Sequence, residues 1–471
     1  MTSGHDGHAP AVRIRDLHPT LRLRLGLAFF ERTLTTMAIP LMAIYLSQQL
    51  GVQVAGLLII GTVVVAIVAG LASGHVADHY GRRRALLIGS TVMTIGFGGM
   101  ALAAAPWWGS PLTVFAFYLL QVAAASFIAP VHETVIIDVT TPEQRKAAFT
   151  ISYWSFNIAM AAGALLGGFL YSGYFDDLLI GAAACGLVAT LITWRYLAET
   201  APEASGSDAT AVAGAAGGRG AVRDMLAGYL APLSDRRFMV LFLAMTLVLG
   251  LEMQRTTGFV AIRLAENVPT QGLLPFGIGP PVTGIQLLGI LQAVNTIGVA
   301  ILALFSQRFL RRLDDRSSVV IGLALFTAGC AALAVGDLAA ALLVAMLVIT
   351  VGELMHIPAM QAMLASVIPD NARSRYMAVF HLNARGGMII ASLSLSVGTL
   401  VSPAGMAVLY VALGAGAVLL YRSLWPRGAR SSPEIPSFAP DPAPVPDAAP
   451  ATEAAEYEAA PQSRKETVSC P

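Results

Sequence analysis

Apolar stretches of about 20 residues recur along the whole chain, and each is long enough for a helix to cross roughly 30 Å of hydrocarbon. Twelve such stretches occupy residues 23–46, 54–75, 84–105, 111–134, 146–171, 178–198, 238–263, 283–306, 317–335, 338–364, 376–400 and 404–424. Only 12% of the residues are charged, about half of the roughly 25% that soluble domains carry. A soluble chain of this length would form several domains, and so few charged residues could not cover the surfaces that those domains expose to water. The sequence therefore predicts an all-α polytopic membrane protein.

The loops between these stretches alternate in positive charge, which sets the predicted orientation. One set of loops contains Arg22 and Arg24; Arg82, Arg83 and Arg84; Arg145 and Lys146; Arg236 and Arg237; Arg308, Arg311, Arg312 and Arg316; and Arg373 and Arg375. The intervening loops, such as 47–53 and 105–111, contain neither lysine nor arginine, and only Arg263 departs from the pattern. Cytoplasmic loops are enriched in these residues, so both termini are predicted to be cytoplasmic and the number of spans even.

The two halves of the chain share landmarks at a constant spacing. Pro130 and Pro358 lie 228 residues apart, and so do Arg145 and Arg373. The repeat predicts two pseudo-symmetric six-helix bundles, residues 23–198 and 238–424, with a substrate site between them near the membrane midplane. Around the bundles we expect a cytoplasmic N-terminal segment (1–22), a cytoplasmic linker (199–237) and a disordered cytoplasmic tail (425–471).

Residues 74–86, between the second and third stretches, have the sequence Gly-His-Val-Ala-Asp-His-Tyr-Gly-Arg-Arg-Arg-Ala-Leu. This segment closely resembles the signature loop of the major facilitator superfamily, Gly-x-Leu-Ala-Asp-(Arg/Lys)-x-Gly-Arg-(Arg/Lys), and departs from it at Val76 and His79. The matching positions are Gly74, Ala77, Asp78, Gly81, Arg82 and Arg83. Gly74 would allow close helix packing, and Gly81 would allow a tight turn.

The resemblance implies the twelve-span fold of that superfamily and transport by alternating access. Asp138, at the end of the fourth stretch, is similar to the third charged partner of the signature loop. The predicted cytoplasmic gating motif consists of Gly74, Asp78, Gly81, Arg82, Arg83, Asp138 and Arg145. We expect Asp78, Arg82 and Asp138 to form a latch, meaning a charged contact that joins the two halves in the outward-open state. The alternative is that the arginines only set the topology.

Within the superfamily, the chain is most like the twelve-span drug/proton antiporters. Gly163–Gly168 resembles their Gly-Pro-x-x-Gly-Gly motif, with Ala164 in place of the proline. Tyr118 occupies the position of their frequent intramembrane arginine, and Glu31-Arg32 weakly resembles the Glu-Arg pair of proton-coupled peptide transporters. The resemblance implies proton antiport and leaves peptide import as an alternative.

Several ionisable residues fall inside the predicted spans, where a charge costs at least ~2.5–3.5 kcal/mol and therefore indicates function. They are Glu31 and Arg32 in the first span, Glu252 and Arg255 in the seventh, Glu353 and His356 in the tenth, and Arg385 in the eleventh. Glu252 and Arg255 share one helical face and are expected to form an internal ion pair. We expect Glu31 or Glu353 to carry the coupling proton, and the alternative for each is a purely structural ion pair.

The central cavity is expected to be mainly apolar, which suits amphipathic or hydrophobic solutes better than sugars. Its predicted lining is Phe29, Phe30, Met37, Trp154, Phe156 and Met253, unless these side chains face lipid or pack between helices. The predicted function is proton-coupled efflux of drugs or natural products by a secondary active transporter, with antibiotic resistance as a consequence. The alternatives are a proton-coupled importer of peptides or other small metabolites, and a membrane-embedded sensor or enzyme.

Other partners and chemistries find no support in the sequence. The net charge of +1 gives no basis for nucleic-acid binding, and Cys185, Cys330 and Cys470 are too scattered for a metal site. No Gly-x-x-x-x-Gly-Lys-(Ser/Thr) loop occurs, so no ATP site is expected. The histidines are scattered and form no catalytic cluster, so neither a cofactor nor enzymatic activity is expected. The predicted partners are a small solute, protons and membrane lipid, for a monomer in a bacterial inner membrane.

Overall fold

The computed structural model describes residues 18–200, 232–274, 279–310, 314–369, 373–380 and 382–425. Most of the predicted N-terminal segment, most of the linker and nearly all of the tail lie outside these ranges. Helix α1 (Pro19–Leu50) begins before residue 23, so residues 19–22 belong to the first helix rather than to the N-terminal segment.

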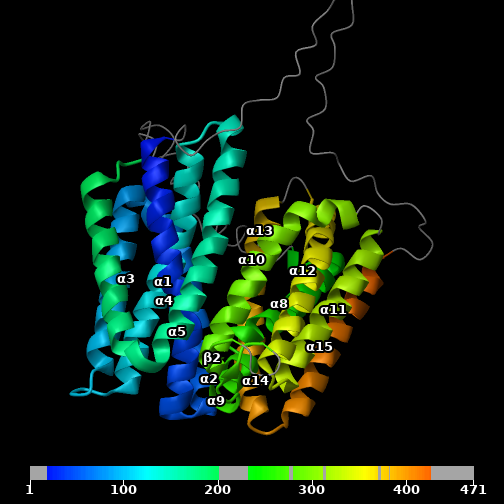
Figure 1. The fold of residues 1–471 in the computed structure, drawn as a ribbon. Helices are drawn as coiled ribbons and strands as arrows, with labels where there is room; N and C mark the ends of the chain where they lie inside the picture. Colours follow the sequence, from blue (N-terminus) through cyan, green and yellow to red (C-terminus); the bar gives the residue numbers. More distant parts are fainter. Residues whose placement is uncertain are drawn as a thin grey trace, which may run out of the picture. The chain divides into compact units, whose positions relative to one another are not determined.

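Five helices form the first half: α1, α2 (Val52–Tyr80), α3 (Arg82–Ala104), α4 (Pro111–Asp138) and α5 (Pro142–Tyr196) (Figure 1). Ser110 and Thr141 accept N-cap hydrogen bonds at the starts of α4 and α5. Gly51 and Gly81, with φ of 84° and 92°, separate α1 from α2 and α2 from α3. Helix α5 is 55 residues long and departs from helical geometry at Tyr174, so it supplies both the fifth and the sixth predicted spans.

The second half contains α8 (Arg236–Glu252), a 3-10 turn η2 (Met253–Arg255), α9 (Phe259–Asn267), α10 (Gly284–Leu310), α11 (Asp315–Val335), α12 (Ala339–Val367), α13 (Arg373–Phe380), α14 (Asn383–Gly398) and α15 (Pro403–Leu424). An antiparallel hairpin of β1 (Gln271–Gly272) and β2 (Pro281–Val282) precedes α10. The predicted seventh span, 238–263, is present within the membrane-spanning segment Arg236–Asn267, but its helix ends at Glu252 and resumes at Phe259. The eleventh span is likewise divided between α13 and α14.

Ten helical segments in the described ranges are long and apolar enough to cross a membrane. One of them, Ala148–Tyr196, bends at Tyr174 and counts once, while α13 and α14 are each too short to count. When α5 is counted twice and α13–α14 once, the order of elements matches the twelve predicted spans. Pro130 and Pro358 lie inside α4 and α12, at corresponding places in the two halves. The prediction of a helical polytopic fold is confirmed.

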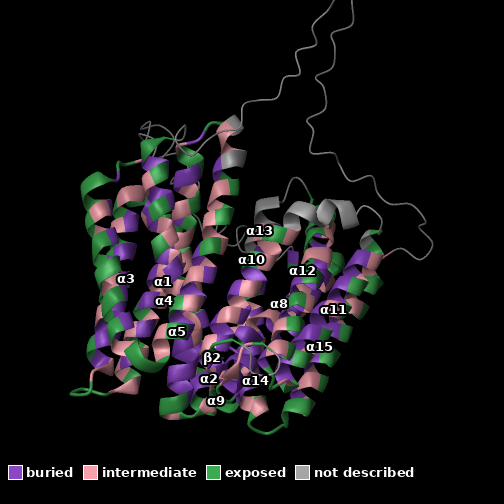
Figure 2. Cartoon of the chain, viewed as in Figure 1, coloured by how far each residue is buried: buried purple, intermediate pink, exposed green. Residues whose placement is uncertain are grey.

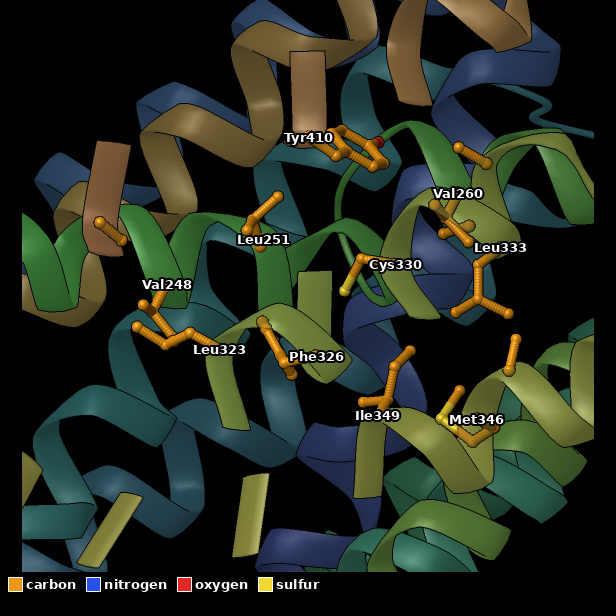
Figure 3. Packing of buried hydrophobic residues seen from close by; sticks show 14 of the residues in the cluster. Val248, Leu251, Val260, Leu323, Phe326, Cys330, Leu333, Met346, Ile349 and Tyr410 are labelled. Atoms are coloured by element: carbon orange, nitrogen blue, oxygen red, sulfur yellow. The ribbon is translucent and has the colours of Figure 1, made fainter. Parts of the chain in front are cut away.

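Each half has its own apolar core (Figure 2). Phe97 and Tyr118 are buried in the first half, and Phe326 and Ile349 pack beside Cys330 in the second (Figure 3). Large apolar side chains are also exposed on the outside, including Leu71, Leu102, Leu187, Leu400 and Val408. Helices that are apolar on their outer faces as well as their inner ones require lipid rather than water around them.

The two halves approach each other closely through small residues. A Cβ on Gly289 of α10 would lie 2.5 Å from the backbone oxygen of Ala164 in α5. A Cβ on Gly56 of α2 would lie 3.0 Å from the backbone oxygen of Ser392 in α14. Backbones come this close only where a side chain is absent, so these glycines define the contact between the halves.

Candidate functional site

The second half buries a charged group around Arg255. Arg255 Nη2 lies 3.1 Å from Glu353 Oε1 and 3.9 Å from Glu252 Oε1. Arg255 is 4% exposed and Glu353 5%, whereas Glu252 is half-buried. We call Glu252, Arg255, Glu353 and the adjacent Asn295 the Arg255 cluster. With both carboxyl groups ionised, two negative charges surround one positive charge, and the cluster carries one net negative charge.

Asn295 of α10 holds the Glu353 carboxylate from the other side. Its Nδ2 donates to Glu353 Oε2 at 2.8 Å and to Thr350 Oγ1 at 3.1 Å. Both oxygens of Glu353 therefore have a partner, one cationic and one neutral. A buried ion pair persists only when its remaining polar atoms are also bonded, and Asn295 meets that requirement here.

The break in the seventh span places Arg255 beside Glu353. Gln254, in the η2 turn, donates from Nε2 to the Gly250 carbonyl at 3.1 Å and accepts at Oε1 from the Phe259 N–H at 3.1 Å. These bonds satisfy backbone groups that the interruption of the helix leaves free. The expected Glu252–Arg255 pair is present at 3.9 Å, but Glu353 is the nearer carboxylate.

His356 lies one turn after Glu353 and has other partners. Its Nδ1 lies 2.7 Å from the Gly352 carbonyl oxygen, and its ring packs edge-on against Phe326 with centroids 5.3 Å apart. A carbonyl can only accept, so His356 Nδ1 carries the proton and donates. The described contacts of His356 are those of a residue that holds α12 against α11.

The first half contains a cavity of about 280 Å³ lined by α1, α3, α4 and α5. Glu31 lies in its wall and accepts a hydrogen bond from Arg24 Nη2 at 2.8 Å. Arg24 is 1% exposed, so the prediction that placed it in a loop is wrong. The signal that could have paired these residues is their separation of seven positions, because residues two turns apart share a helical face.

Arg32, next to Glu31, contacts an aromatic ring in the same cavity. Its guanidinium carbon lies 4.4 Å from the centre of the Phe156 ring, which is a cation–π contact. His132 and Glu133 of α4 add polar groups to the wall. Of the six apolar residues predicted to line a cavity, Phe29 and Phe156 line this one, while Phe30, Met37, Trp154 and Met253 lie elsewhere.

The charged contact of the predicted latch lies inside the first half. Arg82 Nε donates to Asp138 Oδ2 at 3.2 Å and so joins the start of α3 to the end of α4. The side chain of Asp78 lies outside the described part of the chain, so its role stays a prediction, as does the joining of the halves in the outward-open state. Arg145 Nη2 donates to the Thr140 carbonyl just after α4, at 3.5 Å.

Glu199, which follows the sixth span, makes contacts that the sequence does not reveal. Its carboxylate accepts from the backbone N–H groups of Arg82 at 2.7 Å and Arg83 at 3.2 Å. These groups start α3, where the helix dipole favours negative charge. Gly81 makes the turn before them, as predicted, with φ of 92°. The close packing predicted at Gly74 is wrong, because a Cβ there would meet no described atom within 4 Å.

Two further residues singled out in the sequence, Arg385 and Gly168, lie where the halves meet. Arg385 Nη2 of α14 lies 3.5 Å from Ser126 Oγ of α4. Gly168, from the predicted antiporter motif, would bring a Cβ to 3.2 Å from the Cα of Gly289. A small cavity of about 40 Å³ next to these glycines is lined by Arg255, which places the Arg255 cluster beside the contact between the halves.

Comparison with known proteins agrees with this architecture. The Major Facilitator Superfamily model matches residues 25–280 and 273–455. The Na(+), Li(+), K(+)/H(+) antiporter of Planococcus maritimus is 30% identical over 385 residues, which are 82% of this chain and 90% of the relative. The uncharacterized MFS-type transporter YqjV of Bacillus subtilis (strain 168) is 23% identical over 380 residues, 80% of this chain and 85% of the relative.

Two solved structures share the fold at low sequence identity. The peptide transporter POT in complex with sulfate superposes with a TM-score of 0.64 and 18% identity, covering 88% of this chain and 95% of that one. The nucleoside transporter NupG gives a TM-score of 0.62 and 16% identity, covering 86% and 98%. The chain belongs to the Major Facilitator Superfamily, and it is a multi-pass membrane transporter rather than an enzyme.

Proposed function

We propose that this member of the superfamily is a proton-coupled antiporter that exports a monovalent cation, with the Arg255 cluster as the site where proton and cation compete. The unequal charge of the cluster carries the proposal: Glu252 and Glu353 surround a single guanidinium. One bound proton or one monovalent cation makes the cluster neutral. Binding both would leave a buried positive charge without compensation, which is costly. Competition of this kind supports exchange.

The atoms around the cluster suit a hard cation. Carboxylate, hydroxyl and amide oxygens are available from Glu252, Glu353, Thr350 and Asn295, and alkali-type cations prefer oxygen ligands. The Planococcus relative, whose name gives sodium, lithium and potassium as exchanged with protons, supports the same substrate class.

The position of the cluster supports coupling between exchange and alternating access. Arg255 lines the small cavity together with Gly168 and Gly289, where α5 meets α10. A proton on Glu353 would weaken its attraction for Arg255 and leave Glu252 as the charged partner. We expect this shift of Arg255 to alter how tightly the halves pack, and so to change the preference between the two access states.

Efflux of amphipathic or hydrophobic compounds is the second candidate. The cavity of the first half has a volume of about 280 Å³, far more than a bare ion needs, and Phe29, Phe149 and Phe156 line it. In this alternative Glu31, which lies in the cavity wall, would carry the coupling proton. Apolar walls with a few polar groups are typical of small-molecule sites.

Exchange can be tested in proteoliposomes that hold an acidic interior and a pH-sensitive dye. We expect addition of NaCl, LiCl or KCl to collapse the pH gradient for the wild type, and Glu353→Gln to reduce the rate at least tenfold. Asp177→Asn, which removes an exposed carboxylate on α5, is the matched control and should exchange at the wild-type rate. Full alkali-ion exchange by Glu353→Gln would refute the assignment. Gradient collapse by an amphipathic organic cation, but by no alkali ion, would favour the second candidate, with Glu31→Gln as its variant.

We also propose that both termini face the cytoplasm of a bacterial cell and that the protein acts as a monomer in the inner membrane. The arginine-rich loops support this orientation. Reporter fusions at residue 425 and within loop 105–111 test it: a cytoplasmic reporter should be active at the first position and inactive at the second. The reverse pattern would contradict the orientation.

A further inference from the structure

The cavity of the first half contains hydrogen-bond donors that have no acceptor among the described residues. Arg24 is 1% exposed and uses Nη2 for Glu31, while its Nε and Nη1 are buried without a partner. His132 Nδ1 is buried and unpartnered in the same way. Both residues line the cavity. An unsatisfied buried donor costs about 1–3 kcal/mol, and more when it is charged.

His132 can act as a donor toward the cavity. Its Nε2 lies 3.5 Å from Ser152 Oγ. When the Ser152 hydroxyl donates to Nε2, the ring proton is on Nδ1, and Nδ1 donates. The guanidinium of Arg24 has only donors. Arg24 and His132 therefore both have N–H groups without a described acceptor, and both residues line the same cavity.

The carboxylates near these donors do not satisfy them. Glu31 accepts a hydrogen bond from Arg24 Nη2 only, so Arg24 Nε and Nη1 have no described acceptor. Glu133 is exposed and has no described bond to either donor. With Arg24, Arg32, Glu31 and Glu133 ionised, the cavity wall is neutral, so an anion does not meet a net negative field. The unpaired atoms of Arg24 are donors, so at this point of the wall they suit an acceptor group.

The remaining wall is aromatic. Phe29, Phe149 and Phe156 line the cavity, and Arg32 lies against the Phe156 ring. If the acceptor group of a ligand bound Arg24 and His132, the rest of that ligand would contact aromatic rings. The volume of about 280 Å³ is at the lower end for small-molecule sites, which range from roughly 300 to 1,000 Å³.

We propose that this cavity binds a small amphipathic monocarboxylate, with Arg24 and His132 as donors to the carboxylate and the three phenylalanines around its apolar part. The site is separate from the Arg255 cluster, and its existence does not depend on the exchange proposed there. A carboxylate suits the donors because charge-assisted bonds from a guanidinium are among the strongest hydrogen bonds in proteins.

Calorimetric titration of the purified full-length protein in detergent tests the proposal with three probes of one shape. We expect benzoate to bind at least tenfold more tightly than benzyl alcohol or benzylammonium, because only benzoate offers an anionic acceptor. Acetate and chloride report whether the anionic group alone suffices, and both should bind at least tenfold more weakly than benzoate. Tighter binding of benzylammonium, or no measurable benzoate binding to folded protein, overturns the proposal.

Variants assign the donors. Arg24→Lys keeps a positive partner for Glu31 but lacks the additional guanidinium N–H groups, so benzoate affinity should fall at least tenfold. His132→Phe should weaken benzoate binding without changing that of benzyl alcohol. Asp177→Asn, which removes an exposed carboxylate on α5 that does not line the cavity, should bind benzoate as the wild type does. Unchanged benzoate affinity in Arg24→Lys overturns the assignment, and the three-probe comparison on the wild type applies even if a variant fails to fold.

Discussion

A single methyl group at Gly289 should loosen the contact between the two halves. In Gly289→Ala, the new Cβ would lie 2.5 Å from the Ala164 oxygen, whereas ordinary van der Waals contact begins at 3.4 Å. The obstructing atom belongs to the backbone of α5, so no side chain can rotate to make room. Helices α5 and α10 must therefore move apart.

The size of the effect follows from the cost of overpacking. Inserting a methyl group into a tight contact typically costs about 1–3 kcal/mol, which corresponds to about a 5- to 150-fold change in the ratio of packed to separated halves. Gly168→Ala should have a smaller effect, because its Cβ would meet the Ile285 oxygen at 3.0 Å. Gly181→Ala is the matched control on α5, since a Cβ there meets nothing within 4 Å.

Gln292 lines the small cavity beside this contact, so a cysteine at that position reports its opening. We expect the rate at which a thiol reagent labels Gln292→Cys, followed by peptide-resolved mass spectrometry, to rise at least fivefold when Gly289→Ala is added. Gly168→Ala should give an intermediate rate, and Gly181→Ala the rate of the parent. Equal labelling rates for Gly289→Ala and Gly181→Ala would show that this contact does not control access.

Four further substitutions test local contacts through the free energy of unfolding. Asp314 caps α11, and the hydrogen bonds from Ser317 lower its pKa, so Asp314→Ala should lose about 1 kcal/mol at pH 7. Because the pKa of Asp314 is lower in the folded protein than its ordinary value of 3.8, the carboxylate stabilises the fold at pH values above 3.8. The stability difference between the wild type and Asp314→Ala should therefore shrink as the pH falls below 3.8, in denaturation measured at a series of pH values. Arg263 is buried and donates to the carbonyls that end α11, whereas its partner Asp337 is exposed. Arg263→Ala should therefore cost about 2 kcal/mol or more and Asp337→Ala less than about 1 kcal/mol, in thermal unfolding scans. Gly81→Ala should cost at least about 1 kcal/mol, measured in the same scans, because residue 81 has φ of 92°.

The spans and the signature motif were accessible from the sequence because both are local properties. Hydropathy over about 20 residues is enough to identify a membrane helix, and the Gly81 turn needs only a residue that accepts positive φ. Arg24 was assigned to a loop because counting positive charges treats every arginine near a span as solvated. Its pairing with Glu31 depends on burial, which hydropathy does not report.

The geometry of the Arg255 cluster was beyond sequence reasoning for a different reason. Glu252 and Arg255 sit three residues apart, and that spacing assumes a continuous helix. The helix instead breaks there. Hydrogen bonds to Gln254 hold the break, and its Oε1 accepts one of them at 2.8 Å from the hydroxyl of Tyr410, 156 residues along the chain. Glu353 was predicted as functional, but its partner lies 98 residues away. Periodicity cannot reveal contacts at such separations.

Each half buries one arginine–glutamate pair, Arg24–Glu31 at 2.8 Å and Arg255–Glu353 at 3.1 Å. Apolar residues of the same volume would often be as stable as a buried ion pair, so stability alone does not account for two of them in one membrane protein. What remains unsatisfied differs between the halves: a second carboxylate, Glu252, in one and spare guanidinium N–H groups in the other. The first attracts positive charge and the second attracts an acceptor. The two halves therefore differ in the chemistry of their buried pairs, although their helices correspond.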